Sequence, residues 1–404
     1  MKYIKKNLLI DGLKLEVLAK KYSTPLYCYS YKKIKENILN FKKNFKGIDP
    51  LICFSVKANP NKTLLREIGK LGLGADVVSM GELMRALNSG IKANKIVFSG
   101  VGKTTKEINY AIDKKILLIN AESRSEILEI ERIAKIKNKR IKIGIRLNPN
   151  TDAKTLSQIS TGKKENKFGV SEKVFLNLVQ YVKNSKFLKL SCISVHIGSQ
   201  ILDHKPYEKM LTVLQRVIIK TQFEFEYIDL GGGIGIDYAK NKKKLDLKKY
   251  SSNIKKFLNK QKYKIIFEPG RSIIANAGFL ISRIIYIKEG DKKDFIIIDA
   301  AMNDLIRPAL YNAEHQILPV KISKAKSNKA YEFVGPICES TDKFSTLKIF
   351  QKLNEKELIV ICDVGAYGMS LSSNYNLRPK PTELLIKRSK VKVINLRQKL
   401  KNLT

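Results

Sequence analysis

The chain has 404 residues, of which 44% are hydrophobic, so it can bury a large core and divide into more than one domain. Its 77 Lys and Arg against 37 Asp and Glu give a formal net charge of +40. The excess is mostly lysine spread over the whole length, and basic stretches such as residues 240–244 lack the interleaved aromatic residues of a nucleic-acid platform. A basic nucleic-acid-binding protein is therefore the disfavoured alternative from a different class.

The cysteines indicate neither a disulfide framework nor a metal site, because their number is odd and no two are spaced as CxxC. The apolar run at the N-terminus is too short for a signal peptide, and no apolar run reaches the ~18 residues of a membrane helix. We expect a cytoplasmic protein that binds no metal and no membrane. The five cysteines are Cys28, Cys53, Cys192, Cys338 and Cys362.

The first 24 residues predict a short strand, a turn at Asp11-Gly12 and a helical turn, followed by a strand at 24–29 and a helix at 31–45. From residue 51 onward, apolar strands alternate with stretches of helical periodicity. Eight such strands predict a parallel (β/α)8 TIM-type barrel over residues 25–271, with an open doubly wound sheet as the alternative. The strands are expected at about 51–56, 74–77, 95–99, 116–120, 141–147, 190–196, 226–230 and 264–268, and the helices at about 62–71, 80–89, 104–113, 123–136, 171–183, 205–221 and 247–260.

The pattern changes after Arg271, where short β-rich segments are separated by turns and regular helices are lacking. We predict a C-terminal antiparallel β domain over residues 272–404. The strand and helical turn of residues 1–24 have no other sheet to complete, so we expect them to pack with this domain. The predicted fold class is therefore α/β, with a barrel and a β domain that takes in the N-terminal strand.

Lys57 ends the first predicted barrel strand, just before the breaker Asn59-Pro60. Catalytic groups of such barrels gather at the C-terminal ends of the strands. A lysine at this position has a partly desolvated ammonium, which favours the neutral amine and makes it a candidate covalent nucleophile. A solvated strand-end lysine is the competing interpretation.

Three further motifs follow later strands at the same end of the barrel. The glycine run at 231–235 could let backbone N–H groups approach a phosphate, although a flexible turn explains it equally well. Glu268, before the turn Pro269-Gly270-Arg271, could pair with a protonated ring nitrogen, and Arg271 with an anion, or the two could form an ordinary ion pair. His196 ends strand six and could stack on an aromatic cofactor or be a satisfied core histidine.

The C-terminal domain carries a second set of candidates. Arg307 and Tyr311, four residues apart, could clamp a carboxylate. Cys338 and Glu339 lie on a Gly-Pro turn, which suits proton transfer beside a charged substrate group. Tyr367 is expected to be exposed between two glycines.

Taken together and in this order, the motifs resemble the fold-type III pyridoxal-phosphate decarboxylases, and among them the diaminopimelate decarboxylases, over nearly the whole chain. Each motif alone is a modest signal, but about eight of them occur in the same order along the chain as in the family. The resemblance lies in residues 54–59, 74–79 with 81–83, 159–162 with 167–169, 196–200, 231–235, 268–271, 307–311 and 338–340, and in Tyr367.

The resemblance implies that Lys57 holds pyridoxal 5′-phosphate covalently, that His196 stacks on its ring and that Glu268 faces its pyridine nitrogen. It further implies a homodimer, in which Cys338 of the other subunit donates a proton and Glu339 reads the distal ammonium of the substrate. The other residues implied to hold the cofactor are Ser199, Gly231, Gly232, Gly233, Gly235, Pro269, Gly270, Arg271 and Tyr367, and those implied to bind substrate are Arg271, Arg307, Tyr311, Glu339 and Tyr367.

The implied reaction is decarboxylation of meso-2,6-diaminopimelate to L-lysine and carbon dioxide, the last step of lysine biosynthesis. Ornithine, arginine and carboxynorspermidine decarboxylases of the same fold are alternatives, but they typically carry Asp where this chain has Glu339. A racemase of this fold fits less well around Cys338, and single-domain pyridoxal-phosphate carriers lack the region after Arg271.

One loop departs from the family pattern. This chain has Leu156 where the family commonly has a histidine. Because the loop helps to shape the substrate pocket in the family, the departure bears on fine specificity and not on cofactor chemistry.

Overall fold

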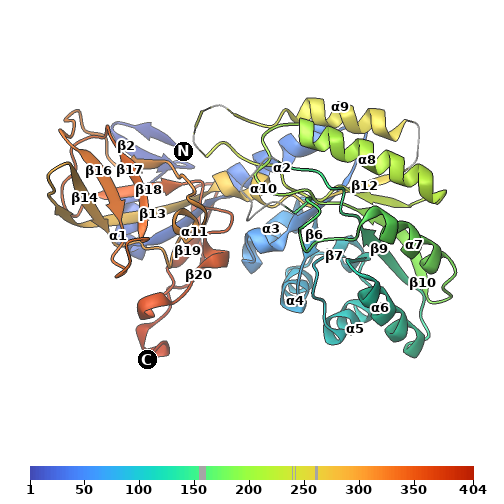
Figure 1. Ribbon diagram of the computed structural model, residues 1–404. Helices are drawn as coiled ribbons and strands as arrows, with labels where there is room; N and C mark the ends of the chain where they lie inside the picture. Colours follow the sequence, from blue (N-terminus) through green and yellow to red (C-terminus); the bar gives the residue numbers. More distant parts are fainter. Residues whose placement is uncertain (154–160, 239, 242, 260–262) are drawn as a thin grey trace. The chain divides into compact units, whose positions relative to one another are not determined.

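The computed structural model describes residues 1–153, 161–238, 240–241, 243–259 and 263–404 (Figure 1). Leu156 therefore lies outside the described residues, as do Ile159 and Ser160 of the loop motif. The chain forms two compact units. One, the barrel unit, comprises Ile38–Ile236 and Lys243–Ser272; the other, the β unit, comprises Met1–Asn37, Asp237–Lys242 and Ile273–Thr404.

The barrel unit is a closed barrel of eight parallel strands with helices around the outside (Figure 1). The predicted barrel is thus confirmed. Its strands are β5 (Leu51–Ser55), β6 (Gly74–Val77), β7 (Ile96–Phe98), β8 (Leu118–Ala121), β9 (Ile141–Arg146), β10 (Leu188–Ser194), β11 (Tyr227–Asp229) and β12 (Lys264–Phe267). Its helices are α3 (Lys62–Lys70), α4 (Met80–Asn88), α5 (Thr105–Asp113), α6 (Arg124–Ile136), α7 (Glu172–Lys183), α8 (Lys205–Thr221) and α9 (Leu247–Leu258), and α2 (Tyr31–Asn44) contains the boundary with the β unit.

Local sequence explains where these helices begin. Ser79, Thr104 and Ser123 each accept a hydrogen bond from a backbone N–H three residues on, at the first turns of α4, α5 and α6. Such caps satisfy N–H groups that the helix itself leaves unpaired. The strands are apolar on both faces because side chains fill the barrel interior and helices cover its outside, and one interior cluster contains Cys53, Val97, Leu118, Cys192, Tyr227 and Ile266.

The β unit is built on a nine-stranded sheet, most of whose neighbours are antiparallel. The predicted antiparallel β domain is thus confirmed, although two of its pairs are parallel, β4 with β19 and β14 with β16. These partners are far apart in sequence, so no tight hairpin dictates their direction. The strands are β4 (Leu26–Ser30), β13 (Gly278–Lys288), β14 (Lys293–Ile298), β15 (Ile317–Pro319), β16 (Ala330–Val334), β17 (Lys343–Leu347), β18 (Leu358–Cys362), β19 (Thr382–Lys387) and β20 (Lys390–Asn395).

The N-terminus belongs to this unit, as expected. A small sheet of β1 (Lys2–Ile4), β2 (Asn7–Ile10) and β3 (Leu13–Lys14) lies beside the C-terminal strands (Figure 1), and the Leu8 N–H donates to the Val320 carbonyl at 2.8 Å. The unit continues to Asn37, past the expected boundary at residue 24, because β4 pairs with both β13 and β19. The short helices α1 (Leu15–Tyr22) and α11 (Arg307–Tyr311) complete it.

Across the described parts of the chain, no helix combines the length and the apolar character needed to cross a bilayer. No group of three or more His, Cys, Asp or Glu side chains in those parts could hold a metal ion. All five cysteines are free thiols, and of these only Cys338 is exposed.

Candidate active site

Lys57 lies just beyond the end of β5, in the single 3₁₀ turn Val56–Ala58. Its Nζ is 3.1 Å from Oδ2 of Asp76, at the end of β6, and its side chain is 42% exposed. The side chain is thus only partly shielded from solvent, and an ion pair to a buried carboxylate orients its amine. The side chain remains accessible to a molecule bound at the rim.

Asp76 is fully buried and connects two strand ends. Its Oδ2 accepts hydrogen bonds from Lys57 and, at 2.5 Å, from the Ser55 hydroxyl. Its other oxygen, Oδ1, is buried without a hydrogen-bond partner among the described residues. A buried carboxylate oxygen is costly to leave unpaired, so this atom marks a place where a bound group can donate.

Asp229 ends β11, Glu268 directly follows the neighbouring strand β12, and the two side chains hydrogen-bond to each other. Burial raises the pKa of Asp229 to about 6. Burial, followed by the charges of Asp229 and Asp76, raises the pKa of Glu268 well above its usual range. Because two carboxylates cannot donate to each other, the pair holds at least one proton.

Polar side chains from three further strand ends support this pair. Asn120 Nδ2 donates to Asp229 Oδ2 at 2.8 Å, and the Ser194 hydroxyl donates to the same oxygen at 3.3 Å. The Ser99 hydroxyl donates to Glu268 Oε1, also at 3.3 Å. The carboxyl ends of the strands thus form a layer of buried polar groups above an apolar interior.

His196 follows β10 and has a defined hydrogen-bonding state. The Gly232 N–H donates to its Nδ1 at 3.2 Å, so Nδ1 carries no hydrogen and the neutral ring has its proton on Nε2. Burial, with the positive charges of Arg146 and Lys57, lowers the pKa of His196 well below its usual value. A neutral, flat imidazole is therefore available at the rim.

The glycine run is required by backbone packing. A Cβ on Gly232 would lie 2.2 Å from the Glu268 carbonyl oxygen, and one on Gly233 would lie 2.3 Å from that of Gly198. Gly231 and Gly233 also have positive φ angles, of 64° and 90°. These glycines are thus needed to bring the rim loops together, whether or not an anion binds.

The turn after β12 adds a buried cation. Arg271 is 7% exposed, and its Nη2 donates to the Ser199 hydroxyl at 3.1 Å. Gly270 packs against the first rim loop, where an added Cβ would lie 2.8 Å from that of Ala58, and the Pro269 carbonyl accepts from the Ser55 N–H. The predicted barrel residues are therefore brought together at one rim.

The remaining candidates belong to the β unit. Arg307, at the start of α11, is 5% exposed, and Tyr311 at its end is half-buried. Cys338 is exposed, and the carboxylate of Glu339 accepts a hydrogen bond from the Thr341 hydroxyl at 2.9 Å. Tyr375 also donates to Glu339, which raises the tyrosine pKa. Tyr367 has a positive φ of 59° and is half-buried.

Several polar residues of the rim were given no role on sequence grounds. Arg146, at the end of β9, pairs with Glu122 at 3.0 Å and stacks on the Phe168 ring, and its Nη2 is buried without a partner among the described residues. The sequence pattern could have identified these residues, because each is polar and lies at or near the C-terminal end of an apolar strand. The residues are Ser55, Asp76, Ser99, Asn120, Glu122, Arg146 and Asp229.

The chemistry of the rim fits pyridoxal phosphate. Lys57 offers an amine, Glu268 an acid for a ring nitrogen, and Arg271 a cation for a phosphate. The unpaired Asp76 Oδ1 and Arg146 Nη2 are buried polar atoms that a bound molecule can satisfy. The fold and the rim define the class of protein as a barrel enzyme built around an aldehyde-bearing aromatic cofactor.

Comparison with known proteins identifies the particular family. The chain belongs to the pyridoxal-dependent decarboxylases, whose pyridoxal-binding domain matches residues 31–275, and its cofactor is pyridoxal 5′-phosphate. The diaminopimelate decarboxylase of Helicobacter pylori J99 is 43% identical over 391 residues, which is 96% of each chain. That of Aquifex aeolicus is 42% identical over 402 residues, covering 98% of this chain and 95% of the relative.

Solved structures agree with the fold. A crystal structure of diaminopimelate decarboxylase from H. pylori complexed with L-lysine matches with a TM-score of 0.92 at 43% identity, covering 96% of this chain and 98% of that one. The enzyme from M. jannaschii in complex with L-lysine matches with a TM-score of 0.93 at 35% identity, covering 99% and 95% of the two chains.

Proposed function

We propose that this protein decarboxylates meso-2,6-diaminopimelate to L-lysine and carbon dioxide, the last step of lysine biosynthesis. The observation that carries the choice of substrate is Glu339, a carboxylate on an exposed turn that two hydroxyl groups hold in place. A substrate with an ammonium group at each end needs an acidic reader for the distal one. The names of the relatives, matched over nearly the whole chain, support the same substrate.

Residues of the barrel unit hold the cofactor in this proposal. Lys57 supplies the amine for covalent attachment, and Arg271 with Ser199 and the N–H groups of the glycine run bind its phosphate. His196, kept neutral, would stack on the cofactor ring, and Glu268 would keep a proton at the ring nitrogen. When bound, pyridoxal phosphate supplies the electron sink that makes loss of a carboxylate possible.

Residues of the β unit read and protonate the substrate. Arg307 and Tyr311 bind a substrate carboxylate, and Tyr367 touches both cofactor and substrate. Cys338 donates the proton that replaces the lost carboxylate. We place Cys338 and Glu339 in the partner subunit of a homodimer with shared sites, working in the cytoplasm.

A coupled lysine-release assay tests this function. Purified protein with added pyridoxal phosphate is given meso-diaminopimelate, ornithine or arginine, and carbon dioxide is followed for all three. We expect carbon dioxide and lysine in equal amounts from meso-diaminopimelate, and little carbon dioxide from the two others. Preferential release of carbon dioxide from ornithine or arginine would overturn the substrate assignment while keeping the cofactor chemistry.

A further inference from the structure

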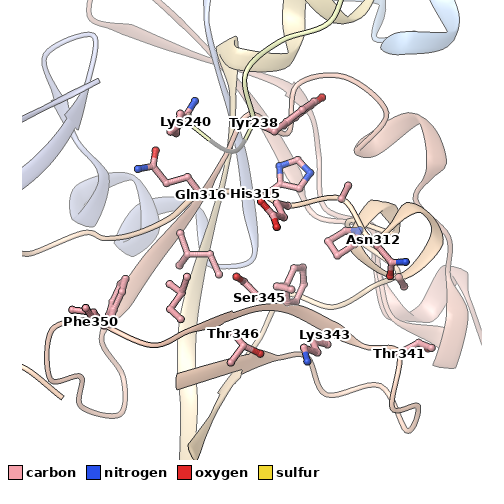
Figure 2. A pocket seen from close by; sticks show the side chains of 18 of the residues that line it. Tyr238, Lys240, Asn312, His315, Gln316, Thr341, Lys343, Ser345, Thr346 and Phe350 are labelled. Carbon is pink, nitrogen blue, oxygen red and sulfur yellow. The ribbon is translucent and has the colours of Figure 1, made fainter. Parts of the chain in front are cut away.

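A buried histidine, His315, follows α11 and faces a cavity of about 770 Å³ in the β unit (Figure 2). Its Nε2 is 2.8 Å from Nη1 of Arg307, and its Nδ1 is 2.8 Å from the carbonyl oxygen of Cys362. Both side-chain partners are buried, His315 at 4% exposed and Arg307 at 5%. Neither the motifs of the chain nor its resemblance to a family assigned this histidine a role.

The two contacts determine the protonation of the ring. A carbonyl oxygen only accepts hydrogen bonds, so the Cys362 contact requires a hydrogen on Nδ1 of His315. A guanidinium only donates, so the Arg307 contact requires a lone pair on Nε2. His315 is therefore the neutral Nδ1–H tautomer, whereas His196 carries its hydrogen on Nε2. The hydrogen bond to the Cys362 carbonyl orients the His315 ring, so that Nε2 faces Arg307 as an acceptor.

A second side chain restrains the same guanidinium. Arg307 Cζ lies 4.4 Å from the centre of the Tyr238 ring, which favours a cation over the ring face. The Tyr238 and His315 rings are edge to face, with centroids 5.2 Å apart and planes at 71°, and Figure 2 shows them side by side on one wall of the cavity. His315 accepts from one N–H of the Arg307 guanidinium, and the Tyr238 ring lies against its face. Together these two contacts fix the plane of the guanidinium.

We propose that His315 is a positioning residue for Arg307, setting the plane in which this arginine binds a substrate carboxylate. The inference rests on the proposed function, in which Arg307 is a substrate-binding residue. An arginine holds a carboxylate by two parallel N–H bonds, and that geometry exists only in the plane of the guanidinium. Loss of the acceptor at His315 lets the plane rotate, so it weakens recognition of the carboxylate and leaves cofactor chemistry unchanged.

Two substitutions separate positioning from general structural support. His315→Leu fills similar space but offers Arg307 no acceptor, whereas His315→Gln retains a side-chain carbonyl that can accept. Ser345→Ala is the matched control, because Ser345 lies on β17 across the same cavity (Figure 2). We expect His315→Leu to raise KM for meso-diaminopimelate about 10- to 100-fold, the contribution of one hydrogen bond to a charged group, with kcat changed much less.

In the same assay, His315→Gln should recover most of the lost affinity, Ser345→Ala should match wild type, and the absorbance of the bound cofactor should be the same in all variants. An unchanged KM in His315→Leu would overturn the positioning role. If wild-type protein still turns over meso-diaminopimelate in that experiment, the proposed function stands. A parallel fall of kcat, cofactor binding and folded yield in both His315 variants would also overturn it. Absence of wild-type turnover would instead overturn the proposed function.

A measurement on wild-type protein does not depend on how well the leucine variant folds. The chain has three histidines, so protein labelled with ¹⁵N-histidine gives few imidazole signals. We expect a neutral Nδ1–H ring that disappears in His315→Gln, beside a neutral Nε2–H ring from His196. An imidazolium or an Nε2–H ring at His315 would overturn the inference.

Discussion

The two units hold their candidate residues in different ways. In the barrel unit, Asp76, Asp229 and Glu268 are at most 9% exposed, and each is hydrogen-bonded to side chains from other strand ends. In the β unit, Cys338 and Glu339 lie on an exposed turn. The barrel therefore preorganises the groups that tune a cofactor, while the turn leaves the groups that read a substrate open to whatever binds against them.

The largest effect is expected from the amine of the barrel. Lys57→Ala should lower decarboxylation by roughly 10²–10⁴-fold, the contribution of one positioned catalytic group, and prevent covalent capture of the cofactor. Borohydride treatment of wild-type protein should place the reduced cofactor on the peptide containing Lys57, as read by mass spectrometry. Lys62→Ala, an exposed lysine on α3, is the control. An unaltered cofactor absorbance in Lys57→Ala would contradict the assignment.

A smaller, more selective effect is expected on the exposed turn. Glu339→Ala should lower kcat/KM for meso-diaminopimelate about 10- to 100-fold, because a charged hydrogen bond to the distal ammonium is lost. The affinity for the cofactor, measured by titrating its absorbance, should stay unchanged. Glu289→Ala removes an exposed carboxylate elsewhere in the β unit and should have no effect. Equal losses in turnover and cofactor affinity would make Glu339 a structural residue.

Mixing two inactive variants tests whether one active site combines the barrel unit of one chain with the β unit of another. Lys57→Ala and Cys338→Ala chains, refolded together in equal amounts, should regain about a quarter of wild-type activity, since half of the dimers are mixed and each has one intact site. Two different affinity tags isolate the mixed dimers. If mixed dimers are shown to form but remain inactive, each site is made by a single chain.

The smallest effect concerns the pH dependence of stability, which should have opposite signs for two carboxyl groups, Glu332 in the β unit and Asp229 in the barrel unit. Burial alone would raise the pKa of Glu332, but hydrogen bonds from Lys293, Lys343 and Thr346 outweigh it and lower the pKa to about 2. A lowered carboxyl pKa stabilises the fold above about pH 4.5, and this contribution is lost as the pH falls toward 2. The raised pKa of Asp229, about 6, does the reverse: its contribution is present below about pH 3.8 and is lost as the pH rises through 6.

Hydrogen exchange of the cofactor-free chain, read by mass spectrometry on peptides of each unit, measures both trends. Glu332→Gln should destabilise the β unit at pH 7 by about 1–2 kcal/mol, a figure discounted because the two lysine side chains are 37% and 46% exposed. Asp229→Asn should flatten the pH dependence of the barrel unit between pH 4 and 6 and leave the β unit unchanged. The same pH dependence for the effects of the two substitutions would contradict the opposite signs expected for the two carboxyl groups.

Much of the barrel could be predicted from the sequence because its strands are buried on both faces and therefore read as continuous apolar runs. The polar residue that interrupts such a run at its C-terminal end lies at the rim, which is how Lys57, His196 and Glu268 could be assigned to one site. The exposed Cys338-Glu339 turn was also marked locally, by the Gly-Pro dipeptide before it.

Interactions between distant residues could not be predicted in the same way. Asp229 and Glu268 share a proton only because barrel closure places β11 beside β12, and Lys57 is oriented by Asp76 only because β5 lies beside β6. Pairing of β4 with β13, some 250 residues later, moved the boundary of the β unit to Asn37.

By itself, then, the sequence determined the barrel and the place of Lys57, His196 and Glu268 at its rim, since each is encoded in a local pattern of apolar runs and breaks. Tertiary structure alone decided the charge and protonation states of those residues. His315 illustrates the reason: its tautomer depends on a carbonyl 47 residues away along the chain, and no local pattern specifies a contact of that range.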